Sequence, residues 1–265
     1  MAETKTMLLN VGPAHPAMHG IIKIVTELDG ETIVNADVEI GYLHRGFEKM
    51  CEQGPWNNAM PYTDRLNYVS PLINNVGFCL AVEKLMDIEA PERAQYIRVI
   101  MSEISRICDH LTAIGASAME LGAFSVFLYM IKAREWLWEL VEQVTGARLT
   151  VSYGRIGGVK ADLPERFSER CREMLHQTRG VLKEVHGLLT HNRIFYDRMH
   201  GTGVISREDC IAYGITGPWL RATGVAYDVR KAFPYFVYDR FDFEVPVAEN
   251  GDNFCLLYTS PSPRD

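Results

Sequence analysis

The chain has 265 residues, of which 47% are hydrophobic and 23% charged, and it carries a formal net charge of −7. These fractions are ordinary for a globular protein that can build a core of useful size. A surface that binds nucleic acid needs a basic excess, and no Lys/Arg cluster supplies one locally, so the composition argues against a nucleic-acid partner.

The six cysteines lie at positions 51, 79, 108, 171, 210 and 255. No two are close enough to form a Cys-x-x-Cys pair, so their spacing predicts no zinc ribbon, redox dithiol or iron–sulfur cluster on this chain. The first ten residues lack the apolar segment of a secretory signal. We therefore expect the chain to lie in a reducing cytoplasm, with its thiols filling small apolar spaces in the protein.

The N-terminal part has the alternation that is typical of strands. Apolar residues alternate over residues 22–26, Asp29-Gly30 supplies a hairpin turn, and residues 32–34 begin a return strand. We expect a small antiparallel sheet over residues 6–42, which forms an N-terminal β domain of residues 1–45.

Within this domain, GPAHPAMHG (residues 12–20) places His15 and His19 four residues apart. That is the spacing of two metal ligands on a helix face, but Pro16 and the flanking glycines favour a loop. A histidine in a tight turn is most often structural. A rigid Gly/Pro frame can also hold an imidazole in place for proton chemistry.

Two further polar clusters follow. GYLHRGFE (residues 41–48) combines His44, Arg45 and Glu48 in a charged loop that enters a short helix, and it is either a solvated charge run or a loop that faces a site or a partner. In PYTDRLNYVS (residues 61–70), two tyrosines flank an Asp64-Arg65 pair. Most such tyrosines are core or interface residues, although Tyr68 could donate a hydrogen bond or a proton.

From about residue 70 the apolar period becomes helical, and we expect a mainly α-helical body over residues 46–254. One helical face collects apolar residues spaced by threes, fours and a seven: Ile97, Met101, Ile104, Cys108, Leu111 and Ala118. Further helices are expected over residues 125–144, with Gly146 as the C-cap, from Leu163-Pro164 to about Leu189, and around 207–213. The stretch DRFDFEVPV (residues 239–247) has a strand-like pattern.

Residues 111–131 are apolar enough to span a bilayer, interrupted only by Glu120. A carboxylate in mid-span costs about 2.5–3.5 kcal/mol on insertion scales, so two adjoining helices in a bundle core are the favoured interpretation. On either interpretation Glu120 is expected to lie in apolar surroundings. Residues 255–265 lack periodicity and are interpreted as a non-native tail.

These motifs, taken together and in order, carry a resemblance. GPAHPAMHG, EIGYLHRGFEK, PYTDRLNYVS, AVEKL, IRVIMSEISRICDHL, YGRIGGVKADLP and GVAYDVRKAFPY closely resemble the quinone-site subunit family of respiratory NADH–quinone oxidoreductase (complex I), in register from about Leu8 to Phe254. That family is related to the large subunit of nickel–iron hydrogenases. The resemblance implies an α+β fold in which a small antiparallel β domain precedes a hydrogenase-like helical bundle, here incomplete at its C-terminal end. We therefore expect the isolated chain to expose apolar helix faces and to fold poorly.

The resemblance also implies site residues. The family holds a quinone headgroup (ubiquinone or menaquinone) between a loop histidine and a tyrosine, and these positions match His19 and Tyr68. An acid that pairs with the histidine matches Glu120, where the family usually has Asp. His44, Arg45 and Glu48 match the loop that faces the site or the cluster. Some members carry a histidine near the terminal cluster at the position of Thr150, and its absence here bears on the pH dependence of that cluster's potential.

Electrons are expected from outside the chain. The hydrogenase relatives hold their metal with Cys-x-x-Cys pairs, which this chain lacks, and no Gly-rich dinucleotide fingerprint is present. The resemblance implies a 4Fe-4S cluster in a neighbouring subunit, with NADH and flavin bound elsewhere in the complex. Implied partners are that cluster subunit, a subunit of the C type and the membrane subunit of the quinone channel. The chain would lie peripherally on the cytoplasmic face of the inner membrane, with its membrane contact made through partners.

Three alternatives remain open. A hydrogenase large subunit is disfavoured by the missing cysteine pairs. A non-catalytic scaffold would bind partner subunits without completing a quinone site. A metal hydrolase built on His15 and His19 lacks a convincingly spaced third ligand.

Overall fold

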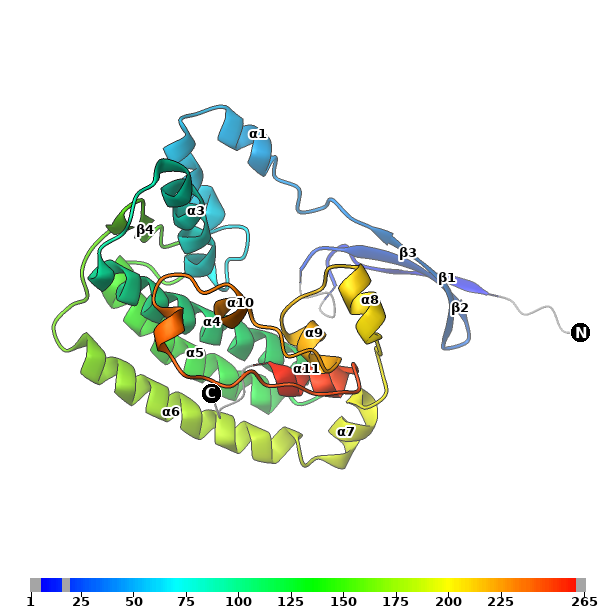
Figure 1. Ribbon diagram of the computed structural model, residues 1–265. Helices are drawn as coiled ribbons and strands as arrows, with labels where there is room; N and C mark the ends of the chain where they lie inside the picture. The colour runs from blue at the N-terminus through cyan, green and yellow to red at the C-terminus, as the bar shows by residue number, and fades with distance from the viewer. Residues whose placement is uncertain (1–5, 16–19, 261–265) are drawn as a thin grey trace, which may run out of the picture. The chain divides into compact units, whose positions relative to one another are not determined.

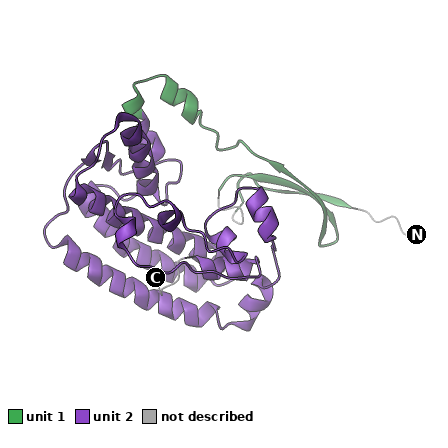
Figure 2. Cartoon of the chain, in the orientation of Figure 1, with its two compact units in different colours: residues 1–58 green, residues 59–265 purple. Residues whose placement is uncertain are grey.

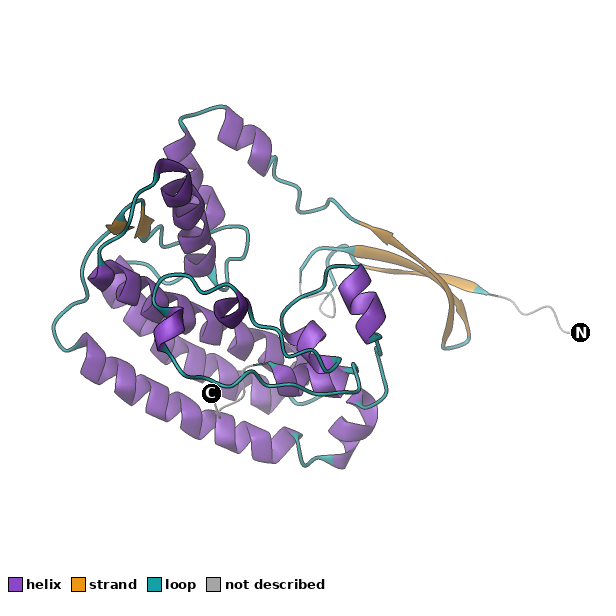
Figure 3. Ribbon diagram, in the orientation of Figure 1, coloured by secondary structure: helices purple, strands orange, loops and turns teal. Residues whose placement is uncertain are grey.

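The computed structural model describes residues 6–15 and 20–260 (Figure 1). Internal contacts divide the chain into two units, Met1–Asn58 (unit 1) and Ala59–Asp265 (unit 2) (Figure 2). The three-stranded sheet belongs to unit 1 and the long helices belong to unit 2 (Figure 3). The expected α+β class, a small antiparallel sheet followed by a helical body, is confirmed.

The sheet of unit 1 has three antiparallel strands in the order β1–β2–β3, which span Met7–Val11, Lys23–Asp29 and Thr32–Glu39. Asp29 pairs with Thr32, so the hairpin loop is Gly30-Glu31, one residue later than predicted. Gly30 has a φ of +63°, a conformation that glycine adopts without a steric penalty. Helix α1 (Phe47–Glu52) follows the sheet, and the 3₁₀ helix η2 (Trp56–Ala59) spans the boundary between the two units.

Unit 2 is mainly helical. Its helices are α2 (Met60–Thr63), α3 (Pro71–Met86), α4 (Glu92–Glu120), α5 (Phe124–Thr145), α6 (Phe167–Leu189), α7 (Arg193–Met199), α8 (Arg207–Ala212), α9 (Pro218–Ala222), α10 (Val229–Ala232), the 3₁₀ helix η3 (Tyr238–Arg240) and α11 (Asn253–Thr259). A two-stranded hairpin, β4 (Gly154–Arg155) and β5 (Gly158–Val159), lies between α5 and α6.

The apolar segment over residues 111–131 forms two helices, as the sequence indicated. Helix α4 ends at Glu120, the chain turns at residues 121–123, and α5 begins at Phe124. The predicted C-cap of α5 is also confirmed: Gly146 has a φ of +82°, and its N–H donates to the Glu142 carbonyl. In the described part of the chain, no helix is both long and apolar enough to cross a membrane.

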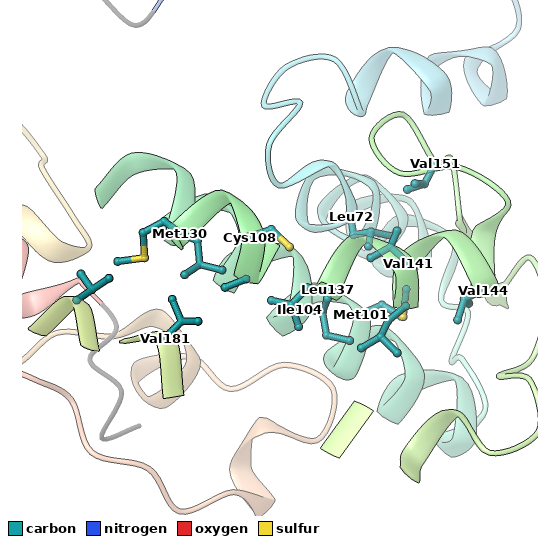
Figure 4. Close-up of a cluster of buried hydrophobic side chains, with 14 of the residues drawn as sticks. Leu72, Met101, Ile104, Cys108, Met130, Leu137, Val141, Val144, Val151 and Val181 are labelled. Carbon is teal, nitrogen blue, oxygen red and sulfur yellow. The ribbon is translucent and has the colours of Figure 1, made fainter. Parts of the chain in front are cut away.

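The core of unit 2 lies between α4, α5 and α6, with α3 packed on α4 (Figure 4). All six residues of the predicted helical face are buried: Ile97, Met101, Ile104, Cys108, Leu111 and Ala118. From α5, Met130, Leu137 and Val141 meet this face, and Val181 of α6 joins them. Four of the six cysteines are buried, and burial raises the pKa of the Cys79 thiol to about 11 and that of Cys108 to about 12.

A buried ion pair fastens the β4–β5 hairpin to the helices. The Arg98 guanidinium of α4 donates to both carboxylate oxygens of Glu83 on α3, at 2.9 and 2.5 Å. Arg98 also donates to the carbonyls of Arg155 and Gly158, and the Gly157 N–H donates to Glu83 Oε1 at 2.6 Å. Both side chains are almost completely buried, so three separate segments meet on one charge pair.

The strand predicted over residues 239–247 is wrong. Residues 238–240 form η3, and residues 241–248 run as irregular chain. Alternating side chains alone do not form a strand, because a ladder needs a neighbouring strand; here the Ala248 N–H donates instead to the Arg221 carbonyl of α9.

Part of the expected tail is helical. Asp252 caps α11 by accepting a bond from the Cys255 N–H, and it also accepts one from the Gly201 N–H. Thr259 is fully buried, and its hydroxyl donates to the Pro218 carbonyl at 2.8 Å. Residues 253–259 therefore pack on α9 in this structure, whereas the non-native origin of residues 255–265 stays a prediction.

Candidate functional site

The loop that carries the two histidines has a well-defined base. Ala14 forms an isolated bridge with Ile21, and Gly12, with a φ of +98°, lies so close to β2 that a Cβ there would be 2.0 Å from the Ile22 carbonyl oxygen. His15 is exposed, and His19 lies outside the described residues. Among the residues that are described, no three His, Cys, Asp or Glu side chains group as metal ligands.

Gly12→Ala is expected to destabilise unit 1 by about 2 kcal/mol, because the new methyl group meets backbone and the residue must keep a left-handed φ. Gly30→Ala is the matched control: its φ is also positive, but no atom lies within 4 Å of the added Cβ. Amide hydrogen exchange over residues 7–11 and 23–29 measures both variants. Equal loss of protection in the two would show that the contact with Ile22 contributes nothing.

The second cluster is an exposed turn. The His44 N–H donates to the Gly41 carbonyl, and the Gly46 N–H donates to His44 Nδ1 at 3.3 Å, which fixes the imidazole beside its own backbone. The side chains of His44, Arg45 and Glu48 are exposed. Glu48 lies in the first turn of α1, where the helix dipole stabilises a negative charge. This exposure fits a solvated charge run as well as a loop that faces a site or a partner, and the latter role stays a prediction.

Tyr68 lies in the turn between α2 and α3, and 57% of its surface is exposed. The turn ends at Ser70, the N-cap of α3, whose hydroxyl accepts a 2.6 Å bond from the Asn67 amide. The Asp109 carboxylate of α4 also accepts hydrogen bonds from the Asn67 amide and the Ser70 hydroxyl, both at 3.3 Å. Tyr68 is therefore an exposed tyrosine on a turn that is anchored to α4.

The Asp64-Arg65 pair of the sequence separates in the structure. Arg65 is exposed and donates to the Pro61 carbonyl. Asp64 is fully buried and accepts bonds from the Ser152 N–H, from the Ser152 hydroxyl and from the Asn75 amide. Burial raises the pKa of Asp64, and these donors oppose that rise. This contact was not predicted from the sequence, in which the adjacent Asn74 and Asn75 among the apolar residues of α3 are the signal that could have indicated it.

Glu120 does not lie in apolar surroundings, and that expectation is wrong. It is the last residue of α4, and its side chain is exposed, because the chain turns at residues 121–123 instead of continuing as a span. A helix rises about 1.5 Å per residue, so Glu120 lies roughly 16 Å along α4 from Asp109 at the Tyr68 turn. Within unit 2 the structure therefore does not bring Glu120 and Tyr68 together.

Glu103 of α4 is the centre of a charged cluster that was not predicted from the sequence. Glu103 accepts a 2.5 Å bond from the Tyr238 hydroxyl and ion-pairs with Arg106 and Arg230. Burial, together with the Glu103 carboxylate, raises the pKa of Tyr238. His110 is partly buried on the same helix, and burial, with Arg106 and Arg221 adding to it, lowers its pKa to about 4.

A family model described as "Respiratory-chain NADH dehydrogenase, 49 Kd subunit" matches residues 120–257, just over half of the chain. The chain belongs to this family. The resemblance that the ordered motifs indicated is therefore confirmed.

Curated relatives extend the match toward the N-terminus. The second D-type subunit of NADH-quinone oxidoreductase from Anaeromyxobacter sp. (strain K) is 58% identical over 251 residues, which cover 95% of this chain and 58% of the relative. The D-type subunit from Myxococcus xanthus is 58% identical over 252 residues, 95% of this chain and 61% of the relative. The first D-type subunit from Sorangium cellulosum is 58% identical over 251 residues, 95% and 62% respectively. The chain thus spans about three fifths of the length of these relatives.

Membership in the 49 kDa subunit family bears unevenly on the predicted residues. The family match begins at Glu120 and leaves out Tyr68 and the loop of His44 and Arg45. The roles expected for those side chains therefore stay predictions.

Proposed function

We propose that the chain acts as the D-type subunit of an NADH–quinone oxidoreductase and forms one wall of the chamber in which quinone is reduced. The observation that carries the proposal is the 58% identity, over 95% of the chain, to proteins named as this subunit of NADH-quinone oxidoreductase. The exposed Tyr68 side chain on its anchored turn adds support, because a hydroxyl presented in this way can reach a ligand.

The chemistry needs two electrons and two protons, since a quinone takes up both in becoming a quinol. Electrons come from a 4Fe-4S cluster in a neighbouring subunit, beside the loop of His44, Arg45 and Glu48. His19 is the readier proton donor, because an imidazole titrates near 6.5 and a phenol near 10. Tyr68 donates a hydrogen bond to the other carbonyl oxygen of the quinone.

Glu120 is proposed as the acid that pairs with His19. This pairing would orient the imidazole ring of His19 and raise its pKa. The acceptor is ubiquinone or menaquinone.

The names of the relatives support a place in a multi-subunit enzyme. The partners proposed within it are the cluster-bearing subunit, a C-type subunit and the membrane subunit of the quinone channel. The chain would sit peripherally on the cytoplasmic face of the inner membrane. Quinone reduction in this chamber would drive proton translocation by the whole complex.

The test places this chain in a working enzyme. The chain replaces the matching segment of the D-type subunit in Myxococcus xanthus, and the complex is purified. Tyr68→Phe is expected to lower kcat/KM for quinone by about tenfold to a hundredfold, because the phenol loses the hydroxyl that binds the quinone oxygen. His19→Ala and Glu120→Gln are expected to lower it too, whereas NADH oxidation with an acceptor that takes electrons at the flavin stays unchanged.

Tyr213→Phe is the matched control, since Tyr213 is also exposed on unit 2 and lies outside the proposed site. If all three site variants reduce quinone at the wild-type rate in an assembled complex, the residues are wrongly assigned. The role of the chain would then shrink to that of a scaffold.

A further inference from the structure

We propose that Asp64 is a positioning residue for Tyr68. It binds the start of the turn that carries Tyr68 (residues 64–70, the tyrosine turn) to the segment 151–159. This inference rests on the proposed function, because it gives Tyr68 its role at the quinone. It adds a residue that neither the motifs nor the family match assigns.

Asp64 is built to act as a clamp. Its side chain is fully buried, and one carboxylate oxygen accepts bonds from the Ser152 N–H and the Ser152 hydroxyl, both at 2.8 Å. The other oxygen accepts a bond from the Asn75 amide. An ionised carboxylate only accepts hydrogen bonds, and three donors from two segments occupy most of its acceptor positions.

Asn75 adds a second hydrogen-bonded connection between the same two segments. Its amide also donates to the Thr63 hydroxyl at 2.8 Å, and its carbonyl oxygen accepts from the Tyr153 N–H at 3.0 Å. Ser152 has a φ of +40°, a conformation that a non-glycine residue keeps only when its surroundings impose it. Asp64 makes two of the bonds that hold Ser152 in this conformation, and Arg155 donates a further one to the Ser152 carbonyl.

The opposite side of the clamp is rigid. Residues 154–159 are fixed to α3 and α4 by the buried pair of Glu83 and Arg98. A change at Asp64 therefore moves the tyrosine turn rather than the hairpin. The far end of that turn is held by Asp109 through Ser70, so Tyr68 lies between two anchored points.

Position matters at a reacting site, since an error of about 1 Å can cost a hundredfold in rate. In the Asp64→Asn variant one of the carboxylate oxygens becomes an NH₂ group, which would face the Ser152 N–H or the Asn75 amide, donor against donor. The turn would have to shift to relieve this contact, and Tyr68 would shift with it. The flavin end of the enzyme would not be affected.

The experiment is a double-mutant cycle in the purified chimeric complex. Asp64→Asn is expected to lower kcat/KM for quinone about tenfold, mainly through a raised KM, with unchanged flavin-site activity. In the Asp64→Asn/Tyr68→Phe double variant the loss is expected to equal that of Tyr68→Phe alone, because Asp64 acts only through Tyr68. Losses that multiply would overturn the proposal, since Asp64 would then act independently of the tyrosine.

Ser152→Ala is the milder variant if Asp64→Asn fails to assemble. It removes one of the two bonds to Ser152 and keeps the backbone N–H, so a smaller loss in kcat/KM that is again non-additive with Tyr68→Phe supports the proposal. Glu89→Gln is the control, because Glu89 is an exposed carboxylate of unit 2 away from this contact.

Two outcomes separate this inference from the proposed function. If Tyr68→Phe lowers quinone reduction but assembled Asp64→Asn and Ser152→Ala behave as wild type, only the positioning role is overturned. If Tyr68→Phe itself has no effect, the proposed quinone role fails, and the positioning role fails with it.

Discussion

Arg98→Met is expected to lower the free energy of unfolding of unit 2 by about 3–5 kcal/mol, because it leaves the Glu83 carboxylate buried without its partner. The Arg98 side chain is fully buried, and it satisfies the Arg155 and Gly158 carbonyls as well as the carboxylate. Urea unfolding followed by far-UV circular dichroism measures the loss, since the long helices all belong to unit 2.

Arg93→Met is the matched control. Arg93 also lies on α4 and also makes paired bonds to a carboxylate, that of Asp162, but both side chains are mostly exposed. Water can replace the hydrogen bonds of such an exposed pair. The free energy of unfolding of Arg93→Met is therefore expected to be indistinguishable from that of the wild type. A similar small change for Arg98→Met would mean that the hairpin is not fastened through this pair.

Replacing both members of the buried pair tests the cause. The Glu83→Leu/Arg98→Met variant should recover part of the stability lost by Arg98→Met alone, because no uncompensated charge remains. Recovery should be incomplete, since the Gly157 N–H and the Gly158 carbonyl lose their partners in the double variant. A double variant less stable than Arg98→Met would show that hydrogen bonding to the hairpin outweighs the buried charge.

The parts of the fold that the sequence predicted are those governed by local physics. The buried face from Ile97 to Ala118 follows from the helical period, and the end of α5 follows from the freedom of Gly146 to adopt a positive φ. The strand predicted over residues 239–247 failed because a strand depends on a partner elsewhere in the chain, and alternation says nothing about one.

The site was less predictable for the same reason. The exposure of His44 and Arg45 could be expected from a Gly-flanked charged loop. The separation of Asp64 from Arg65 could not, because Asp64 binds Ser152, which is 88 positions away in the chain. Glu120 misled the sequence analysis because hydropathy averages over a window and does not register that the helix ends at that residue.

The free energy of unfolding is expected to fall between pH 6.5 and about 4, by up to about 3 kcal/mol more in the wild type than in His110→Gln. Burial, with Arg106 and Arg221 adding to it, lowers the pKa of His110 to about 4 in the folded chain, and Glu103 opposes the shift. In the unfolded chain the imidazole takes up its proton near pH 6.5, so acid favours the unfolded state. The contribution is complete above pH 6.5, is lost as the pH falls toward 4 and changes no further below that.

The comparison isolates one imidazole among several acid-sensitive groups, because carboxylates such as Asp228 and Asp252 titrate in both proteins and cancel in the difference. His176→Gln is the control, since His176 is exposed on α6 and its removal should leave the pH profile of the wild type. Urea unfolding at pH steps from about 4 to 7.5 gives the difference directly. If the His110→Gln profile coincides with the wild-type profile, folding does not lower the pKa of His110, and the prediction fails.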